Sequence, residues 1–375
     1  MPDACVQAKF AGNIILQMLV DPATVGPASF GGLFAMQSPS AAGSASPAVG
    51  PNAYREYLKA AGFSKEEPKA IYAFNDRRAV LDFLGALATT AAVPWLYWIY
   101  PSWITVVVCV VLSIHNFNAL TQVGHGSGHA SFLSDTRWNT VAGEIACALR
   151  GFSRAGFALS HQMHHAFLNE EDDGDILFGR PDEPTRKLLL MCLQDLMLVT
   201  AFKRLLQYMQ TDRKTYDQRP WDPWEKIIIR NFLDRLGMMV PIAAAQALLL
   251  GYYWIVIGPQ YYFFFYLLPL ATLYPAQIRL RSACEHSFEA GYDVASRGRW
   301  LSRSANASFL ERFIVGPLCN DYHFEHHLLP TAPYYNLPTV RQILERKGIQ
   351  VPLGTGYIGY LAQRWREERE LALAA

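Results

Sequence analysis

The sequence predicts an all-helical integral-membrane protein, with four transmembrane helices in two hairpins and a cytosolic helical cap. Apolar residues make up 51% of the 375-residue chain and gather in long runs. Pairs of these runs are joined by Pro101-Ser102 and by Gly258-Pro-Gln260, which are too short for anything but tight turns. Neither turn contains Lys or Arg, whereas the segments beyond the other ends of the runs are rich in both.

The chain is expected to begin with a mobile leader, residues 1–52, and an amphipathic segment, residues 53–79. The leader ends in an Ala-, Ser-, Gly- and Pro-rich stretch that buries too little apolar surface to offset its ordering entropy. Its start lacks the pattern of a secretory signal, so membrane entry is expected to use internal spans. The basic residues of the second segment favour a position along the membrane surface.

Four segments have the length that a bilayer core requires, roughly 20 residues at 1.5 Å rise each. They are residues 80–100, 103–123, 237–257 and 261–280, within one membrane domain predicted over residues 80–350. Because positive residues favour the cytosol, we expect both termini there, including a C-terminal tail of residues 351–375. Aromatic anchors flank the turns as they do at headgroup level, namely Trp98, Tyr100, Trp103, Tyr252, Tyr253, Trp254, Tyr261 and Tyr262.

The net charge argues against a nucleic-acid-binding protein, and the cysteine pattern argues against a disulfide-stabilised protein. The formal net charge is +1, so no basic field exists to bind nucleic acid. The six cysteines are scattered and none forms a CxxC pair, which indicates free thiols rather than a disulfide framework.

Eight of the ten histidines fall into three tight groups, which are His125 and His129, then His161, His164 and His165, then His323, His326 and His327. Residues three and four apart share a helix face, so each group can direct its imidazoles to one place. These groups, and His286 just after the fourth predicted span, are expected to converge on one site at the cytosolic edge of the membrane. Nine imidazoles exceed what one ion uses, so the sequence predicts a site for two metal ions.

Imidazole ligands suit zinc, copper, nickel and iron alike. A zinc hydrolase is disfavoured because the first group, His125-Gly-Ser-Gly-His129, lacks the glutamate of HExxH. A carboxylate di-iron bundle is disfavoured because Glu-x-x-His pairs do not organise the site. Iron with O2 fits better, since hydrolysis cannot attack the C–H bonds of a lipid. His115, roughly 15 Å deeper by helical rise, is expected to line a substrate tunnel or to make a structural hydrogen bond.

The histidine boxes resemble those of the membrane fatty acid desaturase and hydroxylase superfamily, over about residues 75–350. The resemblance rests on His161-Gln-Met-His-His165, Tyr322-His-Phe-Glu-His-His327, Pro333-Tyr-Tyr-Asn-Leu-Pro338 and Glu285-His286. It implies that the nine histidines hold two iron ions under a cytosolic cap, with O2 as co-substrate. The first box is one residue shorter than in the acyl-CoA branch, and Ser282 stands where that branch has a water-bridging Asn. The chain therefore looks like a bacterial-type acyl lipid desaturase.

Polar residues near the histidines are candidates for holding the imidazoles in register. Asn320 is expected to replace that Asn or, alternatively, to cap a helix. Carboxylates that accept imidazole N–H groups are sought among Asp172, Asp173, Asp175, Glu285, Asp321 and Glu325, and the run that contains Asp175 can equally be a solvated loop. Arg279 and Arg281 are expected to meet an acidic headgroup or to anchor the fourth span.

Sequence and resemblance together predict an O2-dependent fatty acyl lipid desaturase of a bacterial inner membrane. No His-Pro-Gly-Gly haem motif and no CxxC spacing occurs, so a separate electron donor of ferredoxin or cytochrome b5 type is expected. The first alternative is a lipid or carotenoid hydroxylase or ketolase, because small shifts in substrate position decide between the outcomes. The second is a metal transporter or receptor, which is disfavoured because transporters place ionisable ligands near mid-membrane.

Overall fold

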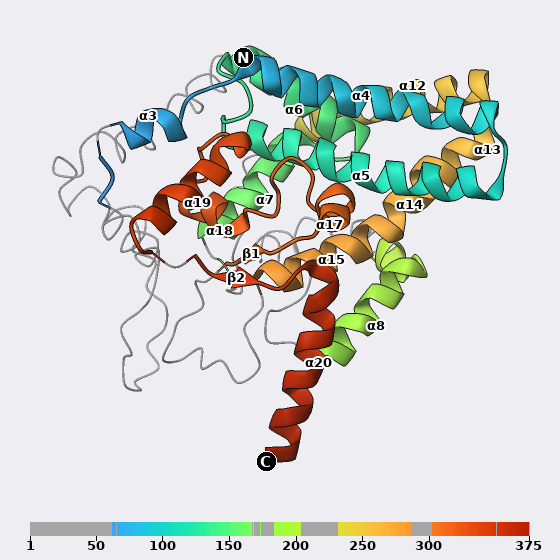
Figure 1. The fold of residues 1–375 in the computed structure, drawn as a ribbon. Coiled ribbons are helices and arrows are strands. Elements are labelled where there is room, and N and C mark those ends of the chain that lie inside the picture. Colours follow the sequence, from blue (N-terminus) through green and yellow to red (C-terminus); the bar gives the residue numbers. More distant parts are fainter. Residues whose placement is uncertain are drawn as a thin grey trace. The chain divides into compact units, whose positions relative to one another are not determined.

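The structure is a computed structural model that describes residues 62–64, 66–166, 168, 173, 184–203, 232–286, 302–349 and 351–374. All of them belong to one unit that runs from Ala48 to Ala375. The predicted leader lies outside the described residues. The described part is mostly helical, as predicted, and its one small sheet pairs two parallel strands of two residues each, β1 (Ser304–Ala305) and β2 (Leu353–Gly354) (Figure 1).

The first predicted hairpin is confirmed as two long helices that lie side by side, α4 (Asp76–Ile99) and α5 (Trp103–Gly128) (Figure 1). Each begins with a capping side chain: Asn75 accepts the backbone N–H of Arg78, and Ser102 accepts that of Thr105. The aromatic residues at the turn, Trp98, Tyr100 and Trp103, are all exposed, as headgroup anchors must be. The 26 residues of α5 extend about 39 Å, so its last turns reach past a hydrocarbon core of about 30 Å.

Within the described residues, three helices are long and apolar enough to cross a membrane. They are Glu67–Ile99, which joins α3 (Glu67–Ile71) to α4, then α5, and the Gly237–Val256 part of α12 (Phe232–Val256). The fourth predicted span is helical but divided into α13 (Pro259–Tyr262), the π-helical η2 (Phe263–Leu267), α14 (Leu268–Ala271) and α15 (Leu273–His286). None of these pieces alone has spanning length, so the count of four spans is not confirmed.

Prolines explain why this segment is divided. Pro269 has no N–H for the carbonyl of Phe265 four residues earlier, and Ser113 of α5 donates its hydroxyl to that carbonyl at 2.7 Å instead. Thr272, three residues before Pro275, leaves the helical region with φ −123° and ψ −76°. The break turns α15 back along α5, toward the histidine-bearing end of that helix (Figure 1).

Two aromatic anchors predicted at the second turn are not anchors. Tyr253 and Tyr262 are buried in the helix core, where Tyr262 donates to Gln246, whereas Trp254 is 66% exposed. The sequence pattern cannot separate these cases, because a run of aromatic residues on a helix necessarily points in several directions.

Two helices cover the end of α5. They are α6 (Thr136–Leu149), which packs on α5 and α12, and α7 (Arg154–Ala166). Gly143 permits the close approach of α6, since a Cβ there would lie 2.1 Å from Ser127 Oγ on α5. The Ser127 hydroxyl also donates to the carbonyl of Asn139 on α6. The last turn of α5 is thereby fixed against α6.

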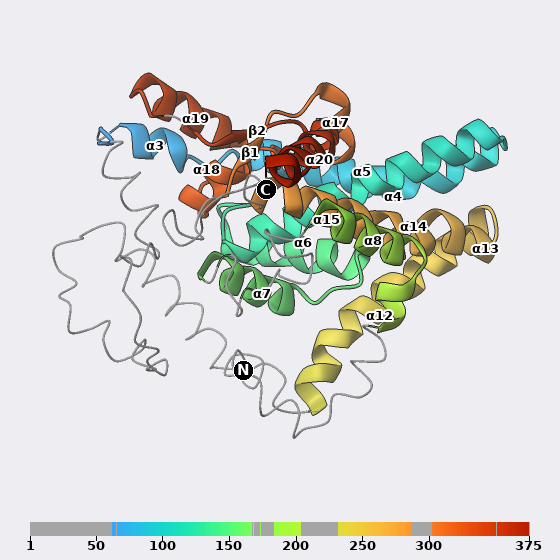
Figure 2. The same cartoon turned by 90° about the horizontal axis from the view of Figure 1, so that it is seen from below.

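The C-terminal third of the chain supplies further helices that pack near the end of α5 and on α15. It contains α17 (Phe309–Ile314), α18 (His323–Leu328), the 3-10 turn η3 (Tyr334–Asn336), α19 (Leu337–Arg346) and α20 (Tyr357–Ala374). Ile71 of α3 is buried with Phe324 and Ile343, so the described end of the amphipathic segment packs on α18 and α19. Together with α8 (Thr185–Leu196), α20 packs on α15 (Figure 2).

Candidate metal centre

Four helices bring nine histidines together, namely the eight of the three groups and His286. The first group stands on the last turn of α5, the second on α7, and the third on α18, while His286 is the last residue of α15. Figure 1 shows α7 and α18 at the same end of α5, with α15 directed toward them. Segments separated by up to 202 residues thus converge at one place, as the sequence predicted.

The nine side chains form two separate sets of ligand atoms. The five-histidine set is His125, His129, His161, His165 and His326, and the four-histidine set is His164, His286, His323 and His327. Within each set the ligand atoms lie within 4.8 Å of one another. Each set therefore has the size of a single metal site.

Each HxxHH box contributes to both sets. His161 and His165 belong to the five-histidine set, while His164 between them points to the other set. The third box is the reverse, because His323 and His327 belong to the four-histidine set and His326 to the first. Helical geometry explains this division: residues four apart lie about 40° apart around the axis, whereas residues three apart lie about 60° away on the other side.

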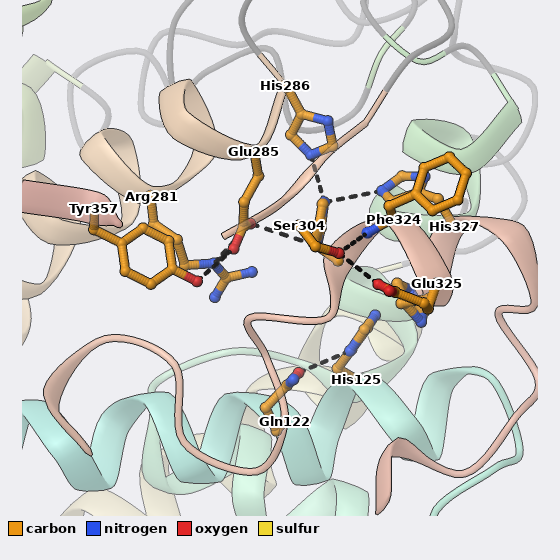
Figure 3. A network of polar contacts seen from close by, with 12 residues as sticks. Gln122, His125, Arg281, Glu285, His286, Ser304, Phe324, Glu325, His327 and Tyr357 are labelled. Carbon is orange, nitrogen blue, oxygen red and sulfur yellow. Dashed lines mark hydrogen bonds and ion pairs between the residues drawn. The ribbon is translucent and has the colours of Figure 1, made fainter. Parts of the chain in front are cut away.

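Two side chains hold imidazoles in a defined orientation. Gln122 Oε1 lies 2.8 Å from Nδ1 of His125 (Figure 3), and Asp173 Oδ1 lies 2.7 Å from Nδ1 of His164. These acceptors retain the proton on Nδ1 and leave Nε2 with its lone pair toward the histidine set. Asp173 was one of the predicted carboxylates. Gln122 was missed, although its position three residues before His125 on the same helix was a readable signal.

The distances between the imidazole Nε2 atoms suit the binding of metal ions better than direct contact between the rings. Nε2 of His161 lies 2.7 Å from Nε2 of His125, and Nε2 of His323 lies 2.8 Å from that of His286. Two neutral imidazoles whose Nε2 lone pairs face each other at this distance repel, whereas a bound cation would attract both. Metal–nitrogen bonds of about 2.0–2.1 Å place ligand nitrogens up to about 4 Å apart, slightly less than the 4.8 Å within which the atoms of each set lie. Nε2 of His129 is buried without a hydrogen-bond partner and is available as a ligand.

Burial keeps these imidazoles neutral. Loss of solvation in the interior, followed by neighbouring positive groups, holds the pKa of His323, His326 and His327 well below the usual histidine value. A neutral imidazole is the form that binds a metal ion, so these side chains are ready to act as ligands at neutral pH.

Glu285 connects the four-histidine set to a buried polar network. Its carboxylate accepts Arg281 Nε at 2.9 Å and the hydroxyl of Tyr357 at 3.0 Å, and it lies 3.4 Å from Nδ1 of His323 (Figure 3). Burial raises the pKa of Glu285, while the charge of Arg281 acts in the opposite direction. Glu285 is thus placed beside an imidazole, as predicted. Tyr357 was missed because it lies 72 residues further along the chain.

Two predicted carboxylates turn away from the histidines. Glu325 lies inside the third box, yet it accepts Ser304 Oγ and Arg341 Nε (Figure 3). Asp321 pairs with Arg312 at 2.9 Å. The expectation that these two hold imidazoles is therefore wrong. The Glu325 side chain instead fixes α18 against β1 and α19, and the Asp321 side chain fixes the chain just before α18 against α17, so both orient the box indirectly.

The remaining predicted site residues have varied positions. Asn320 lines a small cavity of about 20 Å³ together with His129 and His326, and its Nδ2 is buried without a partner. Ser282 lines the large cavity described below. Asp172 and Asp175 lie outside the described residues. His115 is placed apart from both sets, with Nδ1 2.6 Å from the carbonyl of Phe313 and its ring stacked on that side chain.

The expectation for the two arginines of α15 is wrong. Arg279 is 2% exposed and forms a two-point pair with Asp195 of α8, at 2.6 and 3.1 Å. Arg281 is directed inward to Glu285. Neither side chain is available to anchor α15 at a headgroup. Their partner carboxylates are four residues away in one case and 84 in the other, and the sequence marks only the nearer one.

A cavity of about 460 Å³ opens beside the histidines. It lies against the ends of α5 and α15, against α7 and α14, and against α8, and both histidine sets contribute to its wall through His125, His161, His164, His286 and His323. Apolar side chains cover another part of the wall, among them Phe157, Leu270 and Ile278. The volume is that of an ordinary small-molecule site.

Comparisons with known proteins agree with this arrangement. The family model for fatty acid desaturases matches residues 101–355, a range that contains all nine histidines. The chain is also 26% identical over 282 residues to dihydrorhizobitoxine desaturase of Bradyrhizobium elkanii, an alignment that covers 73% of this chain and 74% of that protein. The chain belongs to the fatty acid desaturase family.

Proposed function

We propose that this protein is an O2-dependent fatty acyl lipid desaturase that introduces a C=C bond at a histidine-ligated pair of iron ions. The observation that carries the proposal is the division of nine histidines into sets of five and four, each of single-ion size. Family membership and the similarity to a protein named as a desaturase support the reaction type.

The roles of the side chains follow from their contacts. The five-histidine set would hold one iron ion and the four-histidine set the other, and the bound pair would supply the O2-dependent removal of hydrogen from an unactivated methylene. Gln122 and Asp173 keep the Nδ1 protons of His125 and His164 in place, so both Nε2 atoms remain ligands. Glu285 stands beside His323 and acts on its orientation in the same way.

The large cavity is the proposed position of the reacting part of the substrate. Its apolar wall of Phe157, Leu270 and Ile278 suits methylene groups and excludes water from the reacting carbon. Tyr274, which also lines it, donates or accepts a hydrogen bond with Thr121 at 2.7 Å and is held in place by that contact. A rigid wall is needed because the position of the methylene decides which hydrogen atoms are removed.

The membrane setting completes the proposal. The helices of spanning length would place the protein in a bacterial inner membrane, with the histidine sets and both termini on the cytosolic side. Two electrons for each O2 would come from a separate ferredoxin- or cytochrome b5-type donor. The lipid itself would reach the cavity from the bilayer.

Expression in a host that lacks comparable unsaturated lipids tests the reaction. Wild type is expected to give fatty acids lighter by two hydrogen atoms, seen by mass spectrometry of total lipids, and His164→Ala to give none, because it removes a ligand. Products heavier by one oxygen atom would instead identify a hydroxylase or ketolase, and the desaturase proposal would be wrong.

Metal analysis of the purified protein tests the centre separately. Wild type is expected to contain iron, His164→Ala to lose much of it, and His115→Ala to retain it, because His115 belongs to neither set. Zinc without iron in active protein would contradict the proposed chemistry.

A further inference from the structure

Arg150 stands in the wall of the large cavity at the end of α6. It is the residue that follows the last turn of the helix, and it is 6% exposed. Its guanidinium lies 4.9 Å from the ring centre of Phe152 and 4.5 Å from that of Tyr274. All three residues line the same cavity as the histidines. A guanidinium retains its charge in proteins, so a cation is present at this wall.

No carboxylate of the described residues pairs with this cation. Nε of Arg150 is buried without a hydrogen-bond partner. The acidic side chains of the described cavity wall are engaged elsewhere, Asp195 with Arg279 and Glu285 with Arg281. The described wall therefore has one positive charge that no anion among the described residues balances.

A purely structural role at the helix end does not account for Arg150. Basic side chains often bind the last carbonyls of a helix, but those of α6 already have donors. Gln246 of α12 donates to the carbonyls of Ala148 and Leu149 at 2.9 Å, and the hydroxyl of Tyr266 donates to Leu149 as well. Stacking on two rings stabilises a guanidinium but offsets only part of the cost of burying its charge.

We infer that Arg150 binds the carboxylate of the substrate, and that the enzyme acts on an acyl compound with a free carboxylate rather than on an esterified lipid. This inference rests on the desaturase chemistry of the proposed function, and it replaces the esterified acyl lipid proposed there by a free acid. A guanidinium can offer two parallel N–H groups of one edge, and these match the two oxygens of a planar carboxylate. One unbalanced cation beside the negative end of the α6 dipole suits a monoanion and disfavours a phosphate dianion.

Because Arg150 and the histidines border one cavity of about 460 Å³, the carboxylate and the reacting methylene would lie within the same cavity. The carboxylate would act as the fixed end from which the position of the reacting carbon is set. Arg150 is thus a substrate-binding residue that helps to select the site of desaturation.

Binding measurements on the full-length, metal-loaded protein in lipid nanodiscs test the inference without turnover. The probes are hexanoate, methyl hexanoate and dibutyl phosphate, followed by isothermal titration calorimetry. Wild type is expected to bind hexanoate about 10- to 100-fold more tightly than its methyl ester, which lacks the charge. Arg150→Gln should abolish that preference. Arg137→Gln, on the same helix but exposed, is the matched control and should retain it.

Equal binding of acid and ester by wild type would overturn the inference, even if Arg150→Gln failed to fold. Dibutyl phosphate binding as tightly as hexanoate would overturn it too, because a lipid phosphodiester would then fit the site. Iron content measured on the same samples reports on the metal centre alone. If the protein holds no iron after metal loading but still binds hexanoate more tightly than its ester, the proposed function is wrong, whereas the role of Arg150 is retained.

Discussion

Replacement of Gln122 by Leu removes the acceptor that orients His125 while keeping a side chain of similar size. Gln122 is 5% exposed, and its Oε1 lies 2.8 Å from His125 Nδ1. Without the acceptor, either Nδ1–H remains unsatisfied in the interior or the proton moves to Nε2 and blocks the ligand atom. Both outcomes weaken the five-histidine set.

The expected loss can be estimated from this geometry. An unsatisfied buried donor costs about 1–3 kcal/mol. Loss of a side chain that supports a metal ligand lowers metal affinity about 10- to 100-fold, which is about 1.4–2.7 kcal/mol. We therefore expect Gln122→Leu to bind iron in the five-histidine set about 10- to 100-fold more weakly. The assay is iron retained per protein against increasing chelator at pH 7, read by elemental analysis.

Two further variants separate this effect from general damage. Gln122→Glu keeps an acceptor beside His125 and is expected to retain iron. Gln246→Leu makes the same substitution in α12, where it removes hydrogen bonds to α6 but none to a histidine, so it should lower thermal stability more than iron content. If Gln122→Leu held iron as tightly as wild type, the hydrogen bond would have no part in orienting the ligand.

Three other changes have defined outcomes. Gly143→Ala is expected to lower the thermal unfolding temperature and the iron content together, because the new Cβ would meet Ser127 at 2.1 Å; stable protein with normal iron content would contradict the close approach. Asp195→Asn should lower the free energy of unfolding by about 3–5 kcal/mol by leaving Arg279 buried without its anion. The double variant with Arg279→Met should recover most of that loss in thermal denaturation. Burial raises the pKa of Cys192 to about 11. Iodoacetamide should therefore label this thiol slowly at pH 8 and faster as the pH approaches 11. Rapid labelling at pH 8 would show that Cys192 on α8 is exposed to solvent.

The local features of the fold could be predicted from the sequence because they depend on helical spacing. His125 and His129 are four residues apart on one helix, so their convergence needs no knowledge of the rest of the chain. The same reasoning covers the capped hairpin of α4 and α5, whose turn is marked by Pro101. It also explains why a two-ion site could be predicted before its division into sets was known.

Features that depend on distant contacts could not be predicted. Arg279 resembles an interfacial anchor until Asp195, 84 residues earlier, is known to lie beside it. The fourth predicted span has the composition of a continuous helix, and its division depends on Pro269 and on Ser113 of α5, whose hydroxyl binds the carbonyl of Phe265. Glu325 sits between two predicted ligands, yet its side chain follows Arg341 instead, because successive helical residues point in different directions.

The way in which each HxxHH box serves both histidine sets has a consequence for assembly of the centre. An ion held by one set would immobilise α7 and α18, and each of these short helices also presents a histidine to the neighbouring set. Binding of the first ion would then order both helices, so that binding of the second ion would cost less conformational entropy. Apoprotein titrated with ferrous iron would therefore show a sigmoidal binding curve, and few molecules would hold a single ion.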